Sequence, residues 1–571
     1  MRNLILPVTS GTRFDFWLKK KNVCNTVLLQ FSAKGKIFYA VKQAADCYQY
    51  FTYTHYTDGP LEIEWDDDAA DISLFYSWQP ENLSREGVTF LVGDDQALRP
   101  VGSGELGAWY GQEPLRPVLH FSPFINWMND PNGLCKIDGT YHLFYQYHPH
   151  STEWGPMHWG HAASEDLYHW RHYPLFLQPE QNLGALGATG GAFSGTAFQE
   201  RDGSTRFFFT ERLPAYDLYA GYREVQKCAR PGRWLDKPES VKQVLSDLPA
   251  GVDCDFRDPK VWFDNEKNSY LMLLGASVDA DPAVLLFTST NGDEWSFDYL
   301  LYRADAHFRQ HGGRCVECPD FFQAGGKWVL IMGIVGYTEP QTGRHNLLYA
   351  LTGEFSDGRF IPDDKPLQAL DFGTDFYALQ TFRDGQETLG FAWLYNWASK
   401  KTAASCYNGE MSLPRRFTLN SAGVLCMQPV LPPEACIIRQ TEHLHAGQLR
   451  LPVDARRAFS VTLQGEGLSR LRVALQDESG EQVELCYADG VLGLRADGHD
   501  DGQYCAPLDA LKDIELFFDA GIVEVFANQG SQCGTRRYFH ISACQAIALE
   551  YNPSAKITAA KLTHYRSVWG Q

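Results

Sequence analysis

Three carboxylic acids in this chain have neighbouring residues that could position them for nucleophilic or acid–base catalysis. Asp130 precedes a Pro-Asn-Gly turn, and Asp258 and Glu317 each stand close before a proline with bulky apolar residues beyond it. Asn, Asp, Pro and Gly together favour a tight bend, which would hold Asp130 at a strand end, facing a cleft. Each acid alone also fits a structural role, capping a turn or pairing with a base. Together they offer a carboxylate nucleophile and a carboxylic acid with a raised pKa, which glycoside cleavage requires.

The blocks that carry these acids resemble the sequence motifs of glycoside hydrolase family 32, the family of invertases, fructanases and sucrose-6-phosphate hydrolases. The main blocks follow the family's order, at residues 127–133 (WMNDPNG), 193–196 (FSGT), 256–259 (FRDP) and 317–320 (ECPD). Further support comes from residues 154–161, 375–378 and 523–526. The resemblance covers the chain from about residue 117 to its C-terminus and leaves the preceding part unexplained.

The resemblance implies a role for each acid. Asp130 would be the nucleophile, Glu317 the general acid and base, and Asp258 the transition-state stabiliser that hydrogen-bonds hydroxyls of the bound fructosyl ring. Nucleophile and proton donor must differ, because one carboxyl cannot do both at once. Arg257 is expected to keep a neighbouring acid ionised or to hold Glu317 in place. The remaining residues that match family positions lining the fructose pocket are Asn129, Gln146, Trp154, Ser194 and Asp375.

The implied activity is that of a retaining hydrolase, which releases terminal β-D-fructofuranosyl residues from sucrose or short fructo-oligosaccharides through a covalent fructosyl-enzyme. The same site would also serve a fructosyltransferase or an exohydrolase of levan or inulin. A non-catalytic sugar-binding propeller is an alternative of another class, and the presence of all three acids argues against it. The resemblance implies no cofactor.

The chain departs from the usual family pattern in three places. Val316 precedes Glu317 where an aromatic residue is common, Tyr407 stands where a tryptophan is often found, and Thr196 replaces a serine. These changes leave the reaction class alone. They leave open the leaving-group side of the pocket, and with it the length and linkage of the substrate.

Composition limits the partners. The chain has 571 residues with 50 basic and 70 acidic side chains, a net charge of −20. This balance argues against a nucleic acid or an anionic membrane as partner and favours an uncharged small-molecule fructoside. A homo-oligomer formed through the N-terminal or C-terminal β module is the protein partner that the sequence leaves open.

The 14 cysteines of the chain, with the character of its N-terminal residues, bear on the cellular compartment in which the protein is expected. The N-terminal residues lack the apolar run of a secretory signal, and no later run is long enough for a spanning helix. Scattered cysteines in a chain without export read as reduced thiols, which predicts a cytoplasmic protein. Cys315 and Cys318 form the only close pair, and no second pair supplies the further ligands that a zinc site needs. We therefore expect no metal, and we interpret Cys315 as incidental.

Recurrent short strands with turn residues between them predict an all-β chain. From the resemblance we expect a five-bladed β-propeller followed by a C-terminal β-sandwich. Short strands with turn residues between them, from about residue 14 to residue 90, predict an extra N-terminal β-rich module that is itself a sandwich. The predicted limits are residues 1–110 for the module, 111–428 for the propeller and 429–571 for the sandwich. A chain of this length is too long for one core, which agrees with several domains.

The N-terminal module is rich in aromatic residues, among them Tyr48, Tyr50, Phe51, Tyr53 and Tyr56. Aromatic faces form platforms on which sugars stack, but in strands they also form ordinary core. The sequence leaves open whether this module binds sugar, packs against the catalytic part or forms an oligomer interface.

Overall fold

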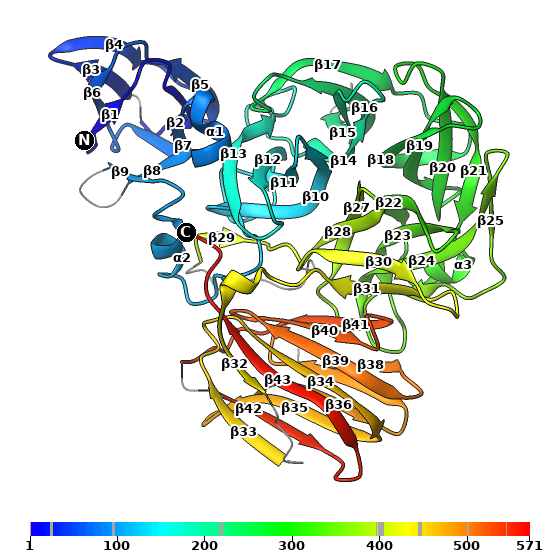
Figure 1. Cartoon of the computed structure of the whole chain (residues 1–571). Coiled ribbons are helices and arrows are strands. Elements are labelled where there is room, and N and C mark those ends of the chain that lie inside the picture. The colour runs from blue at the N-terminus through cyan, green and yellow to red at the C-terminus, as the bar shows by residue number, and fades with distance from the viewer. Residues whose placement is uncertain are drawn as a thin grey trace.

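In the computed structural model the chain is almost entirely β-structure. The structure describes residues 2–22, 27–93, 98–215, 221–394, 397, 405–442, 448–498, 502–543 and 545–570. Figure 1 shows three groups of sheets: the N-terminal module in dark blue, a ring of blades from cyan to yellow, and a C-terminal pair of sheets in orange and red. The predicted all-β fold is confirmed. The short helices are α1 (Leu83–Glu86), α2 (Leu106–Tyr110) and α3 (Ala306–Gln310), with 3-10 turns η1 (Pro80–Asn82) and η3 (Glu434–Cys436).

The N-terminal module consists of two sheets. One contains, in order, β1 (Arg2–Val8), β6 (Gly59–Trp65), β3 (Leu29–Ala33) and β4 (Lys36–Val41). The other contains β5 (Gln49–Thr54), β2 (Arg13–Lys20), β7 (Ala70–Trp78), β8 (Thr89–Gly93) and β9 (Leu98–Val101). Burial alternates along β6, as expected for a strand with one face in a core. Phe14, Phe16 and Phe31 pack between the sheets.

Five antiparallel sheets form the propeller. The first blade contains β10 (Asn126–Ile137), β11 (Thr140–His148), β12 (His158–Ser164), β13 (Trp170–Leu177) and β29 (Tyr407–Asn408). The second contains β14 (Gly191–Gln199), β15 (Thr205–Pro214), β16 (Tyr222–Pro231) and β17 (Pro238–Leu245). The third contains β18 (Val252–Asp264), β19 (Ser269–Val278), β20 (Asp281–Ser289) and β21 (Ser296–Arg303).

The last two blades close the ring. The fourth contains β22 (Cys315–Ala324), β23 (Lys327–Thr338), β24 (His345–Ser356), β25 (Arg359–Pro362) and β26 (Gln368–Ala369), and the fifth contains β27 (Tyr377–Asp384), β28 (Glu387–Trp393), β30 (Arg415–Leu419) and β31 (Leu425–Pro429). The inner strands β10, β14, β18, β22 and β27 lie against one another in sequence, and β27 returns to β10. At the closure β29 pairs in parallel with β10, so residues 407–408 bond to residues 126–127.

The C-terminal sheets pack face to face around their own core. One contains β32 (Ile437–Glu442), β43 (Lys556–Tyr565), β34 (Phe459–Leu468), β39 (Leu511–Phe518), β40 (Ile522–Ala527) and β41 (Gln532–Arg537). The other contains β33 (Gln448–Val453), β42 (Gln545–Tyr551), β35 (Arg470–Asp477), β36 (Gly480–Ala488), β37 (Val491–Ala496) and β38 (Gln503–Pro507). This is the predicted β-sandwich. Within the described residues, no helix has the length and apolar character needed to span a bilayer.

The N-terminal module shares hydrophobic core with the first blade. Phe90 of β8 stacks on Phe124, with ring centroids 3.7 Å apart. Trp569, near the C-terminus, packs against Tyr110 of α2 and stacks on His172 of β13, which brings the end of the chain beside α2 (Figure 1). The glycine-rich segment before α2 therefore leads into packed structure. The predicted domain limits at residues 110 and 428 stay a prediction.

Buried charges join the propeller to the sandwich. His120 lies between Asp519 and Glu524, at 2.7 Å and 2.9 Å, and Glu524 also pairs with Arg415 of the fifth blade. Burial favours neutral groups, but Arg415 and His120 outweigh it and lower the pKa of Glu524 to about 2. Against the same burial penalty, Asp519 and Glu524 raise the pKa of His120 to about 9. The joint is therefore a charged cluster at neutral pH.

Three histidines lie where the module meets the first blade: His148 and His158, which are buried, and His150, which is half-buried. Burial lowers the pKa of His150 to about 2 and of His158 to about 3, and it also lowers that of His148. Below about pH 6.5 these histidines take up protons in the unfolded chain but not in the folded one. The stability that they contribute is therefore complete above that pH and is lost as the pH falls below it.

Burial also raises the pKa of Asp258, Glu211 and Glu515 to about 7, and these acids gain stability as the pH falls from 7 to 5. The test is therefore a comparison: over this range the Tm of the wild type should fall relative to that of His150→Phe, which lacks one of the three histidines. His345, an exposed histidine, provides the control, and His345→Phe should keep the wild-type slope. Thermal scans at matched rates measure the slopes, and equal slopes for the wild type and His150→Phe would contradict the prediction.

Candidate active site

The three predicted acids lie at β-bulges near the start of their inner strands. A bulge bends a strand and re-aims its side chains. Asp130 lies in a register shift of β10, Asp258 in one of β18, and Glu317 begins one in β22. Strands β14 and β27 have shifts at the corresponding place. Because these five strands surround one channel, the bulges turn their residues toward a common axis.

Asp130 is surrounded by uncharged donors. Its Oδ1 accepts a hydrogen bond from the Asn129 side chain at 3.0 Å, and its Oδ2 accepts from Gln146 at 3.2 Å and from the Ser194 hydroxyl at 2.5 Å. The Cys318 thiol is 3.6 Å from the same Oδ2. Burial raises the pKa of Asp130, while the bonds from Ser194 and Asn129 oppose that rise. The structure thus brings three predicted binding residues onto this acid.

Asp258 is held by backbone geometry. Its φ is +64°, in the left-handed region that is unfavourable for most residues, and its N–H donates to Thr210 Oγ1 at 2.9 Å. The Oδ2 atom accepts from the backbone N–H of Cys318 at 2.8 Å. Burial raises the pKa of Asp258 to about 7; Arg257 opposes this, and the charges of Glu317 and Asp130 add to it. The strain indicates that this carboxyl is held in place for a purpose.

Glu317 lies between a cation and a phenol. Its Oε1 accepts from Arg257 Nη2 at 2.9 Å, and its Oε2 accepts from the Tyr377 hydroxyl at 2.9 Å. The side chain of Glu317 is 21% exposed, whereas that of Arg257 is 3% exposed. Glu317 can therefore exchange protons with solvent while its carboxylate is held in one position. Since Cys318 contacts both Asp130 and Asp258, the three acids converge on one place.

Arg257 is the centre of a buried ion cluster. Its Nη1 lies 2.6 Å from Asp255 and 3.2 Å from Glu224, and its Nη2 is 3.2 Å from the Cys315 sulfur. Losing one partner of such a group is costly, because the remaining charges stay buried. Cys315 therefore contacts the site's cation, which corrects our interpretation of it as incidental.

Aromatic side chains form one wall beside the acids. Trp154 is half-buried and lies edge-on to Phe193 at 6.2 Å and to Trp397 at 6.4 Å, and Trp397 stacks on Trp127 at 5.7 Å. The indole N–H of Trp127 donates to Asn129, at 2.8 Å. Such faces suit the C–H surface of a sugar ring, while nearby amides and acids suit its hydroxyls.

Asp375 has contacts elsewhere. It is fully buried, its Oδ2 accepts a hydrogen bond from the backbone N–H of Arg537 at 2.8 Å, and it lies 3.8 Å from the Arg536 guanidinium, both in β41 of the sandwich. The structure places it at the joint between propeller and sandwich, and its predicted place in the fructose pocket stays a prediction. Its neighbour Tyr377 reaches Glu317 instead.

The three departures from the family pattern also lie in packed structure. Val316 is fully buried in the core between the third and fourth blades, and Thr196 donates to the Pro259 carbonyl at 2.8 Å. Tyr407 is buried and donates to Glu410 at 2.8 Å, with Arg116 over its ring. These changes are accommodated by packing, and they do not explain leaving-group preference.

Sequence reasoning missed several residues of the site. Tyr377 and Cys318 both lie inside recognised motifs, at residues 375–378 and 317–320. Their position in these motifs was the signal that could have identified them. Glu224 and Thr210 carry no local signal, because they reach the site only through pairing of β15 and β16 with neighbouring strands. Among the described residues, only Asp66, Asp67 and Asp68 offer ligand atoms close enough to share a cation, and these belong to the N-terminal module.

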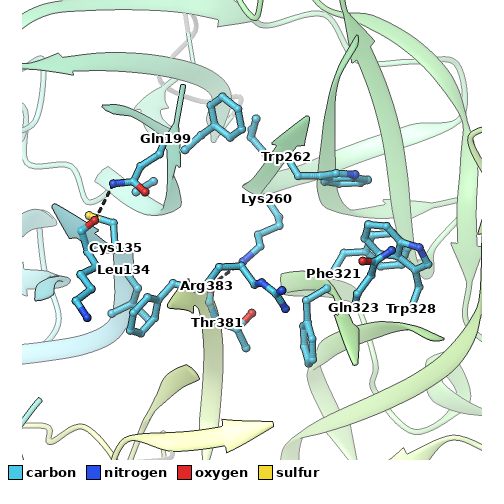
Figure 2. A pocket seen from close by; sticks show the side chains of 16 residues that line it. Leu134, Cys135, Gln199, Lys260, Trp262, Phe321, Gln323, Trp328, Thr381 and Arg383 are labelled. Atoms are coloured by element: carbon cyan, nitrogen blue, oxygen red, sulfur yellow. Dashed lines mark hydrogen bonds between the residues drawn. The ribbon is translucent and has the colours of Figure 1, made fainter. Parts of the chain in front are cut away.

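A separate cavity of about 360 Å³ opens at the other end of the inner strands. Figure 2 shows its lining, with Lys260, Arg383 and Gln199 around the opening and Trp262 and Trp328 to one side. On β10 it begins at Leu134, four positions beyond Asp130 and thus roughly 13 Å along the strand. Its described lining contains no carboxylate, so it lacks the groups that cleave a glycoside.

Comparisons with known proteins agree with this geometry. Residues 120–429 match the family model described as "Glycosyl hydrolases family 32 N-terminal domain", and residues 470–566 match "Glycosyl hydrolases family 32 C terminal". Raffinose invertase of Escherichia coli is 31% identical over 480 residues, 79% of this chain and 94% of that protein. Levanase of Bacillus subtilis is 29% identical over 505 residues, 81% of this chain and 72% of that protein.

A solved structure of a glycoside hydrolase family 32 protein from Bifidobacterium adolescentis superposes with a TM-score of 0.88 at 23% identity and covers 100% of both chains. That fold therefore includes a counterpart of the N-terminal module. A propeller with three carboxyls converging on its channel, followed by a sandwich, defines a glycoside hydrolase. Because the two family models match more than half of its length, this chain belongs to glycoside hydrolase family 32.

Proposed function

We propose that the protein hydrolyses terminal β-D-fructofuranosyl residues from sucrose or short fructo-oligosaccharides, with retention and through a covalent fructosyl-enzyme. The observation that carries the proposal is the convergence of three carboxyls whose partners differ. Asp130, whose donors among the described residues are all neutral, is the nucleophile. Glu317, held by Arg257 and Tyr377 and partly exposed, is the general acid and base.

Asp258 is the transition-state stabiliser in this proposal, and its buried carboxyl would accept hydrogen bonds from hydroxyls of the fructosyl ring. Asn129, Gln146 and Ser194 orient Asp130 and reach the same sugar, and Trp154 packs against it. Arg257 acts through Glu317, which it positions. Asp375, at the joint with the sandwich, also belongs to the proposed binding set.

The names of the relatives support a fructoside substrate but differ among themselves: one is a raffinose invertase, one a levanase and one a sucrose-6-phosphate hydrolase of Escherichia coli. We favour short unphosphorylated fructosides, because the net charge of −20 disfavours an anionic substrate. A reducing-sugar screen over sucrose, sucrose 6-phosphate, kestose, inulin and levan tests this. A much higher kcat/KM for the phosphate ester or for levan would reverse the preference, and transfer products at high sucrose would indicate a fructosyltransferase.

Ser194→Ala tests the assignment of Asp130 through the pH profile. The Ser194 hydroxyl favours the ionised form of Asp130, so removing it is expected to raise the pKa of Asp130 further. The nucleophile must be ionised, and the acid limb of kcat/KM should therefore move to higher pH. Thr196 lies two positions after Ser194, and its hydroxyl donates to the Pro259 carbonyl. Thr196→Val, which removes that hydroxyl, is the matched control. An unmoved acid limb in Ser194→Ala would count against Asp130 as the titrating nucleophile.

We also propose a cytoplasmic site of action on imported fructosides. All eleven described cysteines are free, and the thiol of Cys318 contacts two of the acids. A reducing compartment keeps such thiols intact. Cell fractionation tests this, and activity found mainly in the medium or periplasm would contradict it.

A homo-oligomer through the N-terminal module is a further proposal. The edge strand β4 exposes Ile37 and Phe38, which are 55% and 36% exposed. Such an edge can pair with a second copy. Light scattering of the purified protein tests it, and a monomer at all concentrations would reject it.

A further inference from the structure

A cavity of about 470 Å³ lies between the N-terminal module and the first two blades. The module contributes Trp17 and Lys19 of β2 and residues 46–50, and the propeller contributes three histidines, Pro156, residues 178–179 and residues 181–184. In Figure 1 the seam is the one between the dark-blue module and the cyan strands β12 and β13. A volume of this size is in the range of small-ligand sites. Neither partner forms the cavity alone.

The lining combines aromatic faces with side-chain amides and carries little charge. Tyr50 of the module, which is 40% exposed, faces this cavity, whereas the ring of Tyr48 is covered by His150 and Lys19. The amides come from Gln49, Gln178, Gln181 and Asn182. Among the described lining residues only Lys19 and Asp46 are charged, one of each sign. Burial keeps the three histidines neutral at physiological pH. Aromatic planes with amides and no net charge suit a neutral polyhydroxylated ligand; an anion would need more cations.

The walls are held in place without a ligand. Tyr48 of the module stacks on His150 of the propeller at 4.5 Å, and Lys19 of the same module lies over the Tyr48 ring, 4.4 Å from its centroid. The hydroxyl of Tyr48 donates to Asp71 at 2.7 Å, and Ser73 bonds to His150 at 2.8 Å. Groups fixed in this way lose little entropy when a ligand binds.

The cavity lies behind the loop that carries Trp154. His148 Nδ1 bonds to the Glu153 carbonyl at 2.8 Å, and a Cβ on Gly155 would come within 2.3 Å of the His148 ring. Trp154 packs with the aromatic wall of the active site, while Pro156, two positions on, lines the cavity. One loop therefore separates the two places, and Gly155 is required for its close packing.

We propose that this cavity is a second saccharide site, which binds a neutral oligosaccharide of the substrate class and raises the enzyme's affinity for substrates longer than sucrose. The choice of fructo-oligosaccharide as ligand rests on the proposed function. Tyr50 also lines a neighbouring cavity of about 410 Å³ along the same seam, which gives room for further sugar units. The module thus acts on substrate through its seam with the propeller.

Calorimetric titration of the full chain with nystose tests the proposal, using Asp130→Asn so that the sugar is not consumed. Two binding events are expected for this protein. Adding Gln181→Trp, which fills the cavity from an exposed position, should abolish one event. Adding Leu186→Trp, an exposed residue of the same loop outside the cavity, should leave both. In the otherwise wild-type enzyme, Gln181→Trp should raise KM for nystose several-fold and leave kcat/KM for sucrose unchanged.

A single binding event in Asp130→Asn, or two events that survive Gln181→Trp, would overturn the proposal. So would an equal loss of sucrose and nystose turnover in Gln181→Trp with Leu186→Trp normal. Failure of the wild-type enzyme to hydrolyse any fructoside would instead reject the proposed function. The two failures are distinguishable, because the titration counts sites and the turnover assay counts products.

Discussion

Asp130→Asn is expected to lower kcat by roughly four orders of magnitude or more for every substrate, the scale of losing a catalytic group that acts as part of a unit. The reason is that no other group can attack the anomeric carbon and form the covalent intermediate. The loss should not depend on the leaving group. Steady-state kinetics with sucrose and with an aryl fructoside measure it, and circular dichroism checks that the variant is folded.

Glu317→Ala is expected to behave differently. It removes the proton donor, which matters most for a poor leaving group, and it removes the base that activates water. Azide needs no base, so it should restore turnover and yield a fructosyl azide of retained β configuration, since two displacements at one carbon return the original face. Asp130→Asn should give no β-azide.

Product stereochemistry decides between the two assignments. An inverted azide from Glu317→Ala would show that the mechanism is wrong. Rescue of Asp130→Asn to the β-azide would show that the roles of the two acids are exchanged. Tyr377→Phe provides a milder comparison, because it removes one hydrogen bond to Glu317 and keeps the carboxyl itself.

Glu524→Ala is expected to destabilise the protein by about 3–5 kcal/mol, the cost of leaving buried charges unpaired. Its carboxylate pairs with Arg415 and His120, and all three side chains are fully buried. Its removal leaves Arg415 and His120 buried without the carboxylate that they share. Glu484→Ala in β36 is the control, because the pair of Glu484 with Arg472 is partly exposed and worth less than about 1 kcal/mol.

Denaturant titration at neutral pH measures both variants. If Glu524→Ala lowers the free energy of unfolding no more than Glu484→Ala does, solvent or a rearranged neighbour must pair with the buried charges at the joint. Residues 523–526 supported the family resemblance, and the structure gives this block a physical role: it supplies the acid that fastens the sandwich to the propeller.

The acids could be predicted because each lies in a short block with its own turn residues. Asp130 is followed by the residues that make its bulge, and Asp258 by a proline that stops regular pairing. The strand content followed from period and turn signals in the same way. These features are local, and local features are legible in a single sequence.

Contacts of longer range could not be predicted. Asp375 stands in a recognised block, yet one of its hydrogen bonds comes from the backbone of Arg537, which only the docking of the sandwich brings near. Glu224 of β16 accepts a hydrogen bond from Arg257 of β18, and no neighbouring residue in the sequence indicates this role. The cavity behind Trp154 needs both the module and the propeller. Contacts of this kind are set by tertiary packing, which overrides any local pattern.

The pairing of residues 126–127 with residues 407–408 bears on how the protein is made. A ribosome that adds about 5–20 residues per second needs on the order of tens of seconds to travel between these two segments. During that time the leading blade is out of the tunnel with its inner edge unpaired, and an open strand edge invites pairing with another chain. The N-terminal module emerges earlier and packs on this blade through Phe90 and Phe124. Its seam with the blade lies at the outer strands β12 and β13, so the inner edge of β10 stays open until residues 407–408 arrive to pair with it.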